Sequence, residues 1–442
     1  MFENDPKKVT DPPPAIALRN YGAAKKEDIM SESPESKIIV PVNWDKMYAK
    51  SAEKLTSSAI REILKRTMDP SITSFAGGYP ANEMLPFEEV RIASNKILTD
   101  KQMQVGALQY GPTEGYIPLK EYICEQMQKY GVPAVPGNVT ITNGAQGGIF
   151  LIGLIFIEPG TTVLVERPTY LGVINPWRHL GANFVSISVD KDGMVVDELP
   201  GIIEKYHPKI IYTMPNFHNP LGVTMSLERR KRFAEIVSQH DDIMVVEDDP
   251  YGKLRYTGDH LPPIISLLKD RTFRLQTVSK VMAPGLRVGW IVAPEQPLAK
   301  IFQAIQGECL YTSTYNQMIV NEIYRSGVME ERIKLLRKVY GERRAITLDC
   351  IDRYFPKEVQ CTRPDGGLFL WATTPPSINT LEFFDKALAQ KVAFVPGASF
   401  YANGEKEGLQ TLRVNFSYSG PEKIEPGMKV LGNTLKEELV KK

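Results

Sequence analysis

The sequence predicts an α/β fold in which helices cover both faces of a mainly parallel central sheet, with a smaller α+β domain built from both chain ends. In the centre of the chain, short β-branched runs alternate with helical stretches, which is typical of such a sheet. Near the C-terminus, strand-like pieces follow a long amphipathic stretch. The 442 residues also exceed what one hydrophobic core usually serves, so more than one domain is expected.

The expected strands of the central sheet are short runs rich in valine and isoleucine, which favour extended backbone. They cover residues 139–142, 162–166, 209–214, 243–247, 273–278 and 287–292, with helices such as 227–240 between them. After the amphipathic stretch at 331–354 come strand-like pieces at 367–372, 392–395 and 411–416, then a terminal helix from residue 422. An earlier helix is predicted from the spacing of Ala59, Ile60, Ile63 and Leu64, and Pro70 ends that segment.

These elements divide the chain into four predicted parts. Residues 1–43 are polar and include Pro12-Pro13-Pro14, so they are interpreted as a weakly structured N-terminal arm. Residues 44–85 would form the N-terminal part of the small domain, 86–328 the large ligand-binding domain, and 329–442 the C-terminal part of the small domain.

Composition argues for small-molecule partners. Acidic and basic residues nearly cancel at 52 against 53, so no strong overall field attracts nucleic acid or a membrane surface. The four cysteines form no CxxC pair and the five histidines are dispersed, so no metal site is expected and the thiols are interpreted as core residues. The first residues lack an apolar signal, and the apolar run 147–157 is too short to span a bilayer, so we expect a cytoplasmic protein.

A glycine-rich segment follows the first predicted strand of the central sheet. It reads Asn143-Gly144-Ala145-Gln146-Gly147-Gly148 and opens an apolar helix. Ligands of open α/β sheets bind beyond the carboxyl ends of the strands, and the N-H groups at a helix start favour an anion such as phosphate. A tight strand-to-helix turn explains these glycines about as well.

Consecutive carboxylates stand at the end of another predicted strand, in Glu247-Asp248-Asp249-Pro250-Tyr251. Because desolvating an unpaired carboxylate is costly, these groups need partners. A metal ion, the start of the next helix and the protonated nitrogen of an aromatic ring are three possible solutions.

The next strand ends in Ser279-Lys280, and Arg287 follows shortly afterwards. A single lysine is more often solvated than functional. Beside two hydroxyls and an arginine, however, Lys280 suits a Schiff-base lysine next to a phosphate-binding cup.

Several motifs together resemble the fold-type I, class I/II aminotransferases that depend on pyridoxal phosphate (PLP), and in particular the kynurenine/2-aminoadipate and archaeal aromatic aminotransferase subgroup. The resemblance runs from about Trp44 to the C-terminus, and the order and spacing of the motifs both fit. The matching stretches are residues 74–78, 107–110, 168–170, 215–222, 247–251, 279–280, 284–290 and 412–413.

The resemblance implies specific roles for these positions. Lys280 would carry PLP as a Schiff base and move the proton, Asp248 would pair with the ring nitrogen, and Arg413 would bind the substrate α-carboxylate. The remaining implied residues surround the cofactor or the substrate. Around the cofactor, Asn219 and Tyr251 would contact the ring oxygen, Tyr170 would stack on the ring, and the phosphate would be bound by Ala145, Gln146, Thr277, Ser279 and Arg287. The substrate would be contacted by Asn219, Gly78, Tyr110 and Arg61, with Tyr110 reaching across a homodimer interface.

Some positions keep a second interpretation or depart from the family pattern. Tyr170 could be a core residue, Arg413 a structural ion pair and Arg61 part of a solvated helix face. Ala145 replaces a frequent serine, His218 replaces an amide or a similar residue, and Tyr79 replaces an aliphatic residue in the substrate pocket.

The predicted function is transfer of an amino group from an aromatic, branched-chain or 2-aminoadipate-type amino acid to a 2-oxo acid through a ping-pong mechanism. The resemblance implies 2-oxoglutarate as the 2-oxo acid. A PLP-dependent lyase or decarboxylase on the same fold is the alternative, since the same carbanion can partition differently. A regulator that only senses PLP is disfavoured, because no DNA-binding domain is expected before Trp44 and the Lys280, Asp248 and Arg413 set is intact.

Overall fold

The computed structural model describes residues 42–49, 52, 55, 59–67, 69–404 and 406–440. The chain forms two units, residues 1–49 and 50–442. In the first, Trp44–Lys46 forms a short 3-10 turn, and nearly all of the predicted arm lies outside the described residues. The second unit contains the β-sheets and the hydrophobic cores. Its division into large and small domains stays a prediction.

The described part of the second unit contains an eight-stranded sheet with the order β2-β9-β8-β7-β6-β3-β4-β5. Strands β8, β7, β6, β3 and β4 run parallel to one another, whereas β9 is antiparallel to both β2 and β8, and β5 is antiparallel to β4. The prediction of a mainly parallel sheet is confirmed. The strands are β2 (Val139–Asn143), β3 (Thr162–Arg167), β4 (Asn183–Asp190), β5 (Gly193–Met194), β6 (Ile210–Thr213), β7 (Met244–Asp248), β8 (Thr272–Thr277) and β9 (Val288–Val292).

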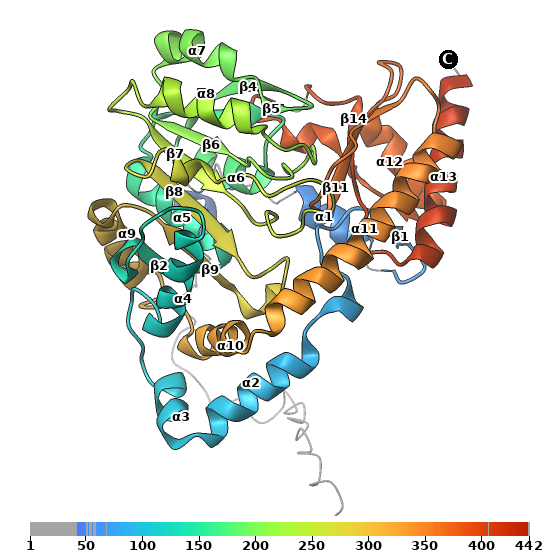
Figure 1. The fold of residues 1–442 in the computed structure, drawn as a ribbon. Helices are drawn as coiled ribbons and strands as arrows, with labels where there is room; N and C mark the ends of the chain where they lie inside the picture. Colours follow the sequence, from blue (N-terminus) through green and yellow to red (C-terminus); the bar gives the residue numbers. More distant parts are fainter. Residues whose placement is uncertain are drawn as a thin grey trace, which may run out of the picture. The chain divides into compact units, whose positions relative to one another are not determined.

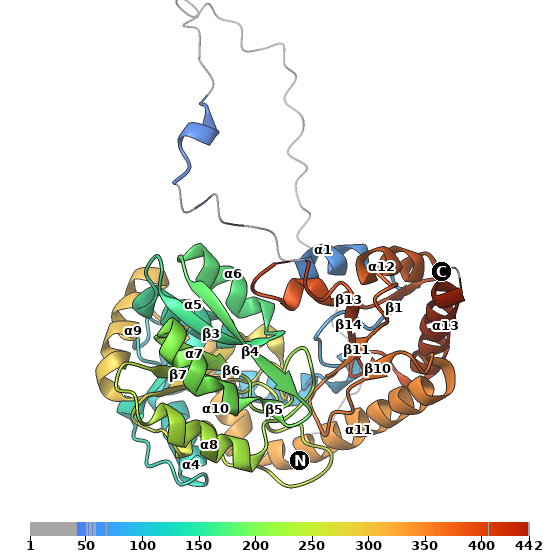
Figure 2. The ribbon, with the colours of Figure 1, turned by 90° about the horizontal axis from the view of Figure 1, so that it is seen from above.

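Alternate residues of the inner strands serve two separate cores, because successive side chains of a strand point to opposite faces. Val163, Val165 and Val246 pack in one core, while Leu164 and Val245 pack in the other. Helices supply both layers, as Figures 1 and 2 show. The helices of this part of the chain are α2 (Phe87–Thr99), α3 (Lys101–Leu108), α4 (Ile117–Gln128), α5 (Gly144–Phe156), α6 (Leu171–His179), α7 (Leu199–Tyr206), α8 (Leu227–Val237), α9 (Glu295–Glu308) and α10 (Thr314–Arg325).

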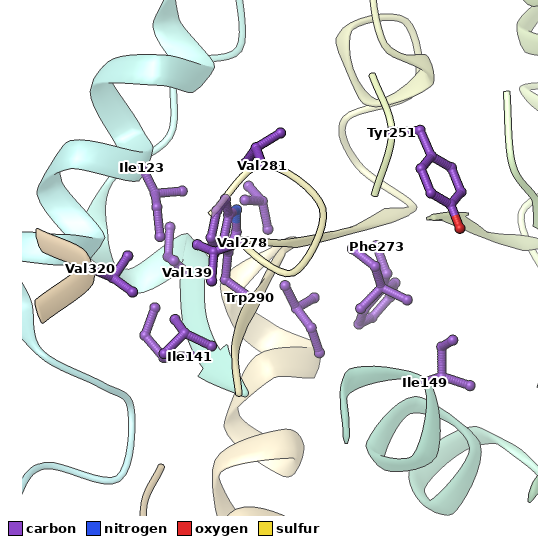
Figure 3. Packing of buried hydrophobic residues seen from close by; sticks show 14 of the residues in the cluster. Ile123, Val139, Ile141, Ile149, Tyr251, Phe273, Val278, Val281, Trp290 and Val320 are labelled. Atoms are coloured by element: carbon purple, nitrogen blue, oxygen red, sulfur yellow. The ribbon is translucent and has the colours of Figure 1, made fainter. Parts of the chain in front are cut away.

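Helix α5 lies very close to the sheet, and glycine makes this approach possible. A Cβ added at Gly148 would lie 2.5 Å from Leu275 Cδ2 on β8, and one at Gly153 would lie 2.5 Å from Trp177 Cδ1 on α6. Figure 3 shows Ile149 of this helix near Phe273 of β8, in the same core as Val139, Val278 and Trp290. The predicted buried helix after the glycine-rich turn is therefore present.

A second, four-stranded antiparallel sheet forms from the last quarter of the chain in the order β10-β11-β14-β13. The segment before the large sheet reaches the same region, because Thr73 and Ser74 of β1 pair in parallel with Val392 and Ala393 of β12. This pairing supports the predicted small domain. Its elements are α1 (Ala59–Arg66), β1 (Thr73–Ser74), α11 (Val328–Tyr354), β10 (Gln360–Cys361), β11 (Phe369–Thr373), α12 (Thr380–Ala389), β12 (Val392–Ala393), β13 (Val395–Pro396), β14 (Thr411–Asn415) and α13 (Pro421–Val440).

The cysteines only partly match the expectation of core thiols. Cys124 and Cys350 are buried and Cys361 is half-buried, but Cys309 is exposed, so the expectation is wrong for that residue. Cys309 directly follows the last residue of α9, where the chain turns away from the core. Among the helices of the described residues, none has the length and apolarity needed to cross a membrane.

Candidate active site

A cavity of about 1170 Å³ opens where the carboxyl ends of the central strands meet the second sheet. Its lining includes all but two of the predicted site residues, even though they come from positions between 78 and 413 in the chain. Because parallel strands bring their carboxyl ends to one sheet edge, the strand-end prediction placed most of them together. The predicted residues that line the cavity are Gly78, Ala145, Gln146, Tyr170, Asn219, Asp248, Tyr251, Thr277, Ser279, Lys280, Arg287 and Arg413.

The three consecutive acids at the end of β7 have different partners because they alternate across the sheet. Glu247 Oε1 accepts a hydrogen bond from Arg274 Nη1 at 2.8 Å, and Asp249 Oδ2 accepts one from Arg274 Nη2 at 2.6 Å. All three side chains of this bridge are buried. One arginine therefore pairs with both flanking acids, and Asp248 is left to face the cavity.

Asp248 combines one satisfied oxygen with one unsatisfied oxygen. Its Oδ2 accepts a hydrogen bond from the Tyr212 hydroxyl at 2.7 Å, while Oδ1 is buried and has no hydrogen-bond partner. Burial raises the pKa of Asp248 to about 7, and the nearby Asp249 acts in the same direction, against the opposing effects of Tyr212 and Lys280. Among the described residues, no cation forms an ion pair with Asp248. A cationic hydrogen-bond donor bound in the cavity would therefore be stabilised at Oδ1.

Lys280 stands just beyond the end of β8, and its amine lines the same cavity. Its Nζ donates a hydrogen bond to the carbonyl oxygen of Gly78 at 2.8 Å. Burial lowers the pKa of Lys280 to about 8, and the positive charges of Arg413 and Arg287 lower it further. A substantial fraction of the side chain is thus a free, nucleophilic amine near pH 8.

This pKa predicts how fast Lys280 forms a Schiff base with the aldehyde of PLP, the cofactor that the sequence motifs imply. Only the unprotonated amine reacts, so the rate of appearance of the visible absorbance band should rise about tenfold per pH unit below pH 8 and level off above it. An unperturbed lysine, with a pKa of about 10.4, would keep accelerating to about pH 10. Stopped-flow absorbance from pH 6 to 10, with Nα-acetyl-lysine as the free-amine control, checks this. A rate still rising steeply above pH 9 would contradict the lowered pKa.

The start of helix α5 and the Arg287 side chain form one end of the cavity. Gly144 has a positive φ of 69°, and a Cβ there would lie 2.6 Å from Arg287 Nη2, so this close approach requires glycine. Nearby, the hydroxyls of Thr277 and Ser279 lie 2.9 Å apart. The first-turn N-H groups of a helix have no partner within that helix and favour anions, so this end of the cavity suits a phosphate group.

Arg413 comes from β14 and lies fully inside, at 1% exposure. Its Nη1 donates to Asn219 Oδ1 at 2.8 Å and its Nη2 donates to the Ala76 carbonyl at 2.8 Å, while Nε is buried without a partner. The guanidinium packs over the rings of Phe369 and Phe400. No carboxylate of the described residues pairs with it, which is the opposite of a structural ion pair.

Two tyrosines and a glutamine complete the wall. The Tyr170 hydroxyl donates to Gln146 Oε1 at 3.3 Å, and Gln146 Nε2 donates to the Gly172 carbonyl at 2.7 Å. Burial raises the pKa of Tyr170 to about 12 and raises that of Tyr251 as well. Both phenols are therefore neutral hydrogen-bonding groups at physiological pH.

Tyr110 and Arg61 are the two predicted residues that remain, and only the Tyr110 side chain is described. Tyr110 is 76% exposed, and its nearest ring neighbour is Tyr311, with ring centroids 6.0 Å apart. Helix α1 contains Arg61, but the Arg61 side chain lies outside the described residues.

The positions that depart from the family pattern have distinct surroundings. Tyr79 lines the cavity, is 46% exposed and packs edge-on against Tyr418, with ring centroids 5.9 Å apart. His218 is buried away from the cavity, with its Nε2 3.1 Å from Glu166 Oε2. Ala145 lines the cavity at the start of α5 and offers no side-chain hydroxyl there.

Sequence reasoning missed Tyr212, the residue that holds Asp248. Tyr212 lies in a predicted strand of the buried sheet, and a buried tyrosine hydroxyl usually needs a hydrogen-bond partner, so the signal was available. The hydrogen-bond partner of Tyr212 could not be named from the sequence, because it depends on which strand lies beside β6. The structure pairs β6 with β7 and places Thr213 opposite Glu247.

The comparisons with known proteins identify the family of the chain. The profile of the family "Aminotransferase class I and II" matches residues 75–431. The chain therefore belongs to this family, and it is a PLP-dependent aminotransferase, as the sequence motifs predicted.

Among the similar proteins is the 2-aminoadipate transaminase of Thermus thermophilus, 39% identical over 90% of this chain and 98% of the relative. The aromatic-amino-acid aminotransferase 1 of Thermococcus litoralis is 38% identical over 90% of this chain and 96% of the relative. A crystal structure of the α-aminoadipate aminotransferase of Thermus thermophilus, complexed with N-(5'-phosphopyridoxyl)-L-leucine, superposes with a TM-score of 0.84 at 38% identity. It covers 91% of this chain and all of the other. The predicted subgroup is confirmed.

Proposed function

We propose that this enzyme transfers the amino group of an aromatic, branched-chain or 2-aminoadipate-type amino acid to 2-oxoglutarate by a ping-pong mechanism. One observation carries the proposal. The amine of Lys280, the unsatisfied oxygen of Asp248 and the unpaired guanidinium of Arg413 all line one cavity. The names of the Thermus and Thermococcus relatives support the first and last donor classes.

The cavity has the chemistry that PLP requires. Asp248 Oδ1, a buried acceptor without a donor, fits a protonated ring nitrogen. Asn219 and Tyr251 offer neutral groups for the ring oxygen, and Tyr170 offers a ring for stacking. The phosphate would be held at the start of α5 by Ala145, Gln146, Thr277, Ser279 and Arg287.

Each residue then has a defined task. When bound, PLP supplies an electron sink for the electron pair that remains when a substrate loses its Cα proton. Lys280 Nζ takes and returns that proton, for which its lowered pKa is suited. The Asp248 carboxylate keeps a proton at the ring nitrogen. Arg413 binds the α-carboxylate, because its planar fork can form two parallel hydrogen bonds to it.

The enzyme is further proposed to act as a homodimer in which Tyr110 reaches the partner's site. Large apolar side chains are exposed along α2, α3 and the residues that follow, and exposed apolar surface is a feature of protein interfaces. The residues concerned are Phe87, Ile92, Val105, Leu108 and Tyr110, each between 56% and 76% exposed.

A donor screen with fixed 2-oxoglutarate tests the function. Glutamate formation, measured by a coupled assay, should appear with at least one of the three donor classes and give parallel lines in double-reciprocal plots. Formation of ammonia or carbon dioxide without glutamate would instead support the lyase or decarboxylase alternative.

Arg61 is proposed to bind the distal carboxylate of dicarboxylic substrates. A charge-assisted hydrogen bond contributes about 1.5–3 kcal/mol, so Arg61→Ala should raise the KM for 2-oxoglutarate about tenfold or more. The KM for a monocarboxylic 2-oxo acid should stay unchanged. Arg66→Ala is the matched control, because Arg66 lies on the same helix, pairs with Asp385 and is not among the residues that line the cavity. An unchanged KM for 2-oxoglutarate in Arg61→Ala would refute this role.

A further inference from the structure

A second, smaller cavity of about 170 Å³ lies apart from the active site and shares none of its lining residues. It is bounded by α4 and the residues just after it, by the segment that follows β7, by β8 and β9, and by α10. Strand alternation separates the two cavities: Gln276 lines the small one, and its neighbour Thr277 lines the active site.

Aromatic rings form much of the wall of this small cavity. Tyr122 of α4 stacks on Tyr324 of α10, with ring centroids 4.6 Å apart. Trp290 of β9 is 5% exposed and donates its indole N-H to Gln276 Oε1 at 3.3 Å. An apolar cavity of about 150 Å³ is enough to hold benzene inside a protein. The space therefore matches a single aromatic ring.

The same cavity has an excess of positive charge. Lys253 lines it, and its Nζ lies 5.1 Å from the centroid of the Tyr324 ring. Lys129 also lines it and donates only to Gln126, at 3.2 Å. A third cation, Arg337, lies 2.7 Å from the His260 ring.

No carboxylate of the described residues forms an ion pair with Lys253, Lys129 or Arg337. The acid that acts on Lys253 is Asp249, which shares Arg274 with Glu247. This buried group keeps one negative charge, which offsets only part of the positive charge of Lys253, Lys129 and Arg337. Burial lowers the pKa of Lys253 to about 8, and the charge of Lys129 lowers it further. An ammonium group that is desolvated without a counter-ion is destabilised, and a bound anion would relieve this.

We propose that this cavity is a second ligand site, which binds a small aromatic carboxylate with its ring among Tyr122, Tyr324 and Trp290 and its carboxylate against Lys253. An aromatic ring and one negative charge match what the walls and the unpaired cations offer. The site is distinct from the Arg413 site proposed for substrate carboxylates, because the two cavities share no residue.

Calorimetric titration of the PLP-loaded enzyme with benzoate tests the site. Wild type should bind two benzoates per chain. Lys253→Met should weaken one of them at least tenfold and leave the other, while Arg413→Met should remove the other and leave the first. Benzamide, which has the ring without the charge, should bind the small cavity at least tenfold more weakly than benzoate does.

Two further variants keep the test decisive. Lys300→Met is the matched control, since Lys300 is an exposed lysine that donates to a glutamine three residues away, as Lys129 does. It should bind as wild type does. Gln126→Trp, which fills the cavity from α4, should also remove the second benzoate. Benzoate binding that neither Lys253→Met nor Gln126→Trp weakens would overturn the proposal, whether wild type binds one benzoate or two. A benzoate that is lost only in Arg413→Met reports on the active site alone.

Discussion

Lys280→Ala is expected to abolish the visible absorbance of bound PLP and to lower the transamination kcat by about 10⁴-fold or more. The variant loses both the amine that carries the cofactor and the base that moves the substrate proton, and general acid-base catalysis alone contributes up to about 10⁴-fold. Absorbance spectra of the purified variant and initial rates of glutamate formation measure the two effects.

The control for Lys280→Ala is Lys269→Ala, because Lys269 is an exposed lysine outside the cavity. It should keep both the absorbance band and the activity. A Lys280→Ala enzyme that retains more than about a tenth of the wild-type kcat would show that another group performs the proton transfer.

Asp248→Asn is expected to lower kcat by about 10²–10³-fold while the cofactor stays attached to Lys280. Loss of one preorganised electrostatic group at a reaction centre typically costs this much. The amide cannot hold a proton on the ring nitrogen as a carboxylate can, yet its size allows the Tyr212 hydroxyl bond to persist. The visible band should therefore remain, and the loss should appear in the rate.

Asp259→Asn is the control for this variant, because Asp259 is an exposed acid in the segment after the same strand. Its kcat should match that of wild type. If Asp248→Asn instead reacts within tenfold of wild type, the proposed pairing with the ring nitrogen is wrong.

Residue patterns predicted most of the fold, because buried parallel strands are short runs rich in apolar, β-branched residues. The six predicted strands all exist, with ends shifted by a few residues at most. Strand β4 was missed although Ser186 and Ser188 alternate with the apolar residues Val185, Ile187 and Val189. It lies near the sheet edge and is only partly buried, so its composition is mixed. Strand β5 has two residues, which is too short for any period to show.

The site could be predicted to the extent that chain order and strand ends determine it. The rule that ligands bind beyond the carboxyl ends of strands directed attention to Asp248 and Lys280. Arg413 needed the family resemblance, because it comes from the second sheet and nothing local indicates that it faces the cavity. Arg274 donates hydrogen bonds to both Glu247 and Asp249 because β8 pairs with β7. No local sequence pattern specifies that pairing.

The central claim is that the Lys280 amine binds PLP covalently in the cavity that Asp248 also lines. Reduction of the purified enzyme with borohydride, followed by proteolysis and mass spectrometry, tests it most directly, because reduction makes the attachment permanent. We predict one phosphopyridoxyl group per chain, on the peptide that contains Lys280. Its absence from that peptide, or its presence on another lysine such as Lys253, would contradict the account.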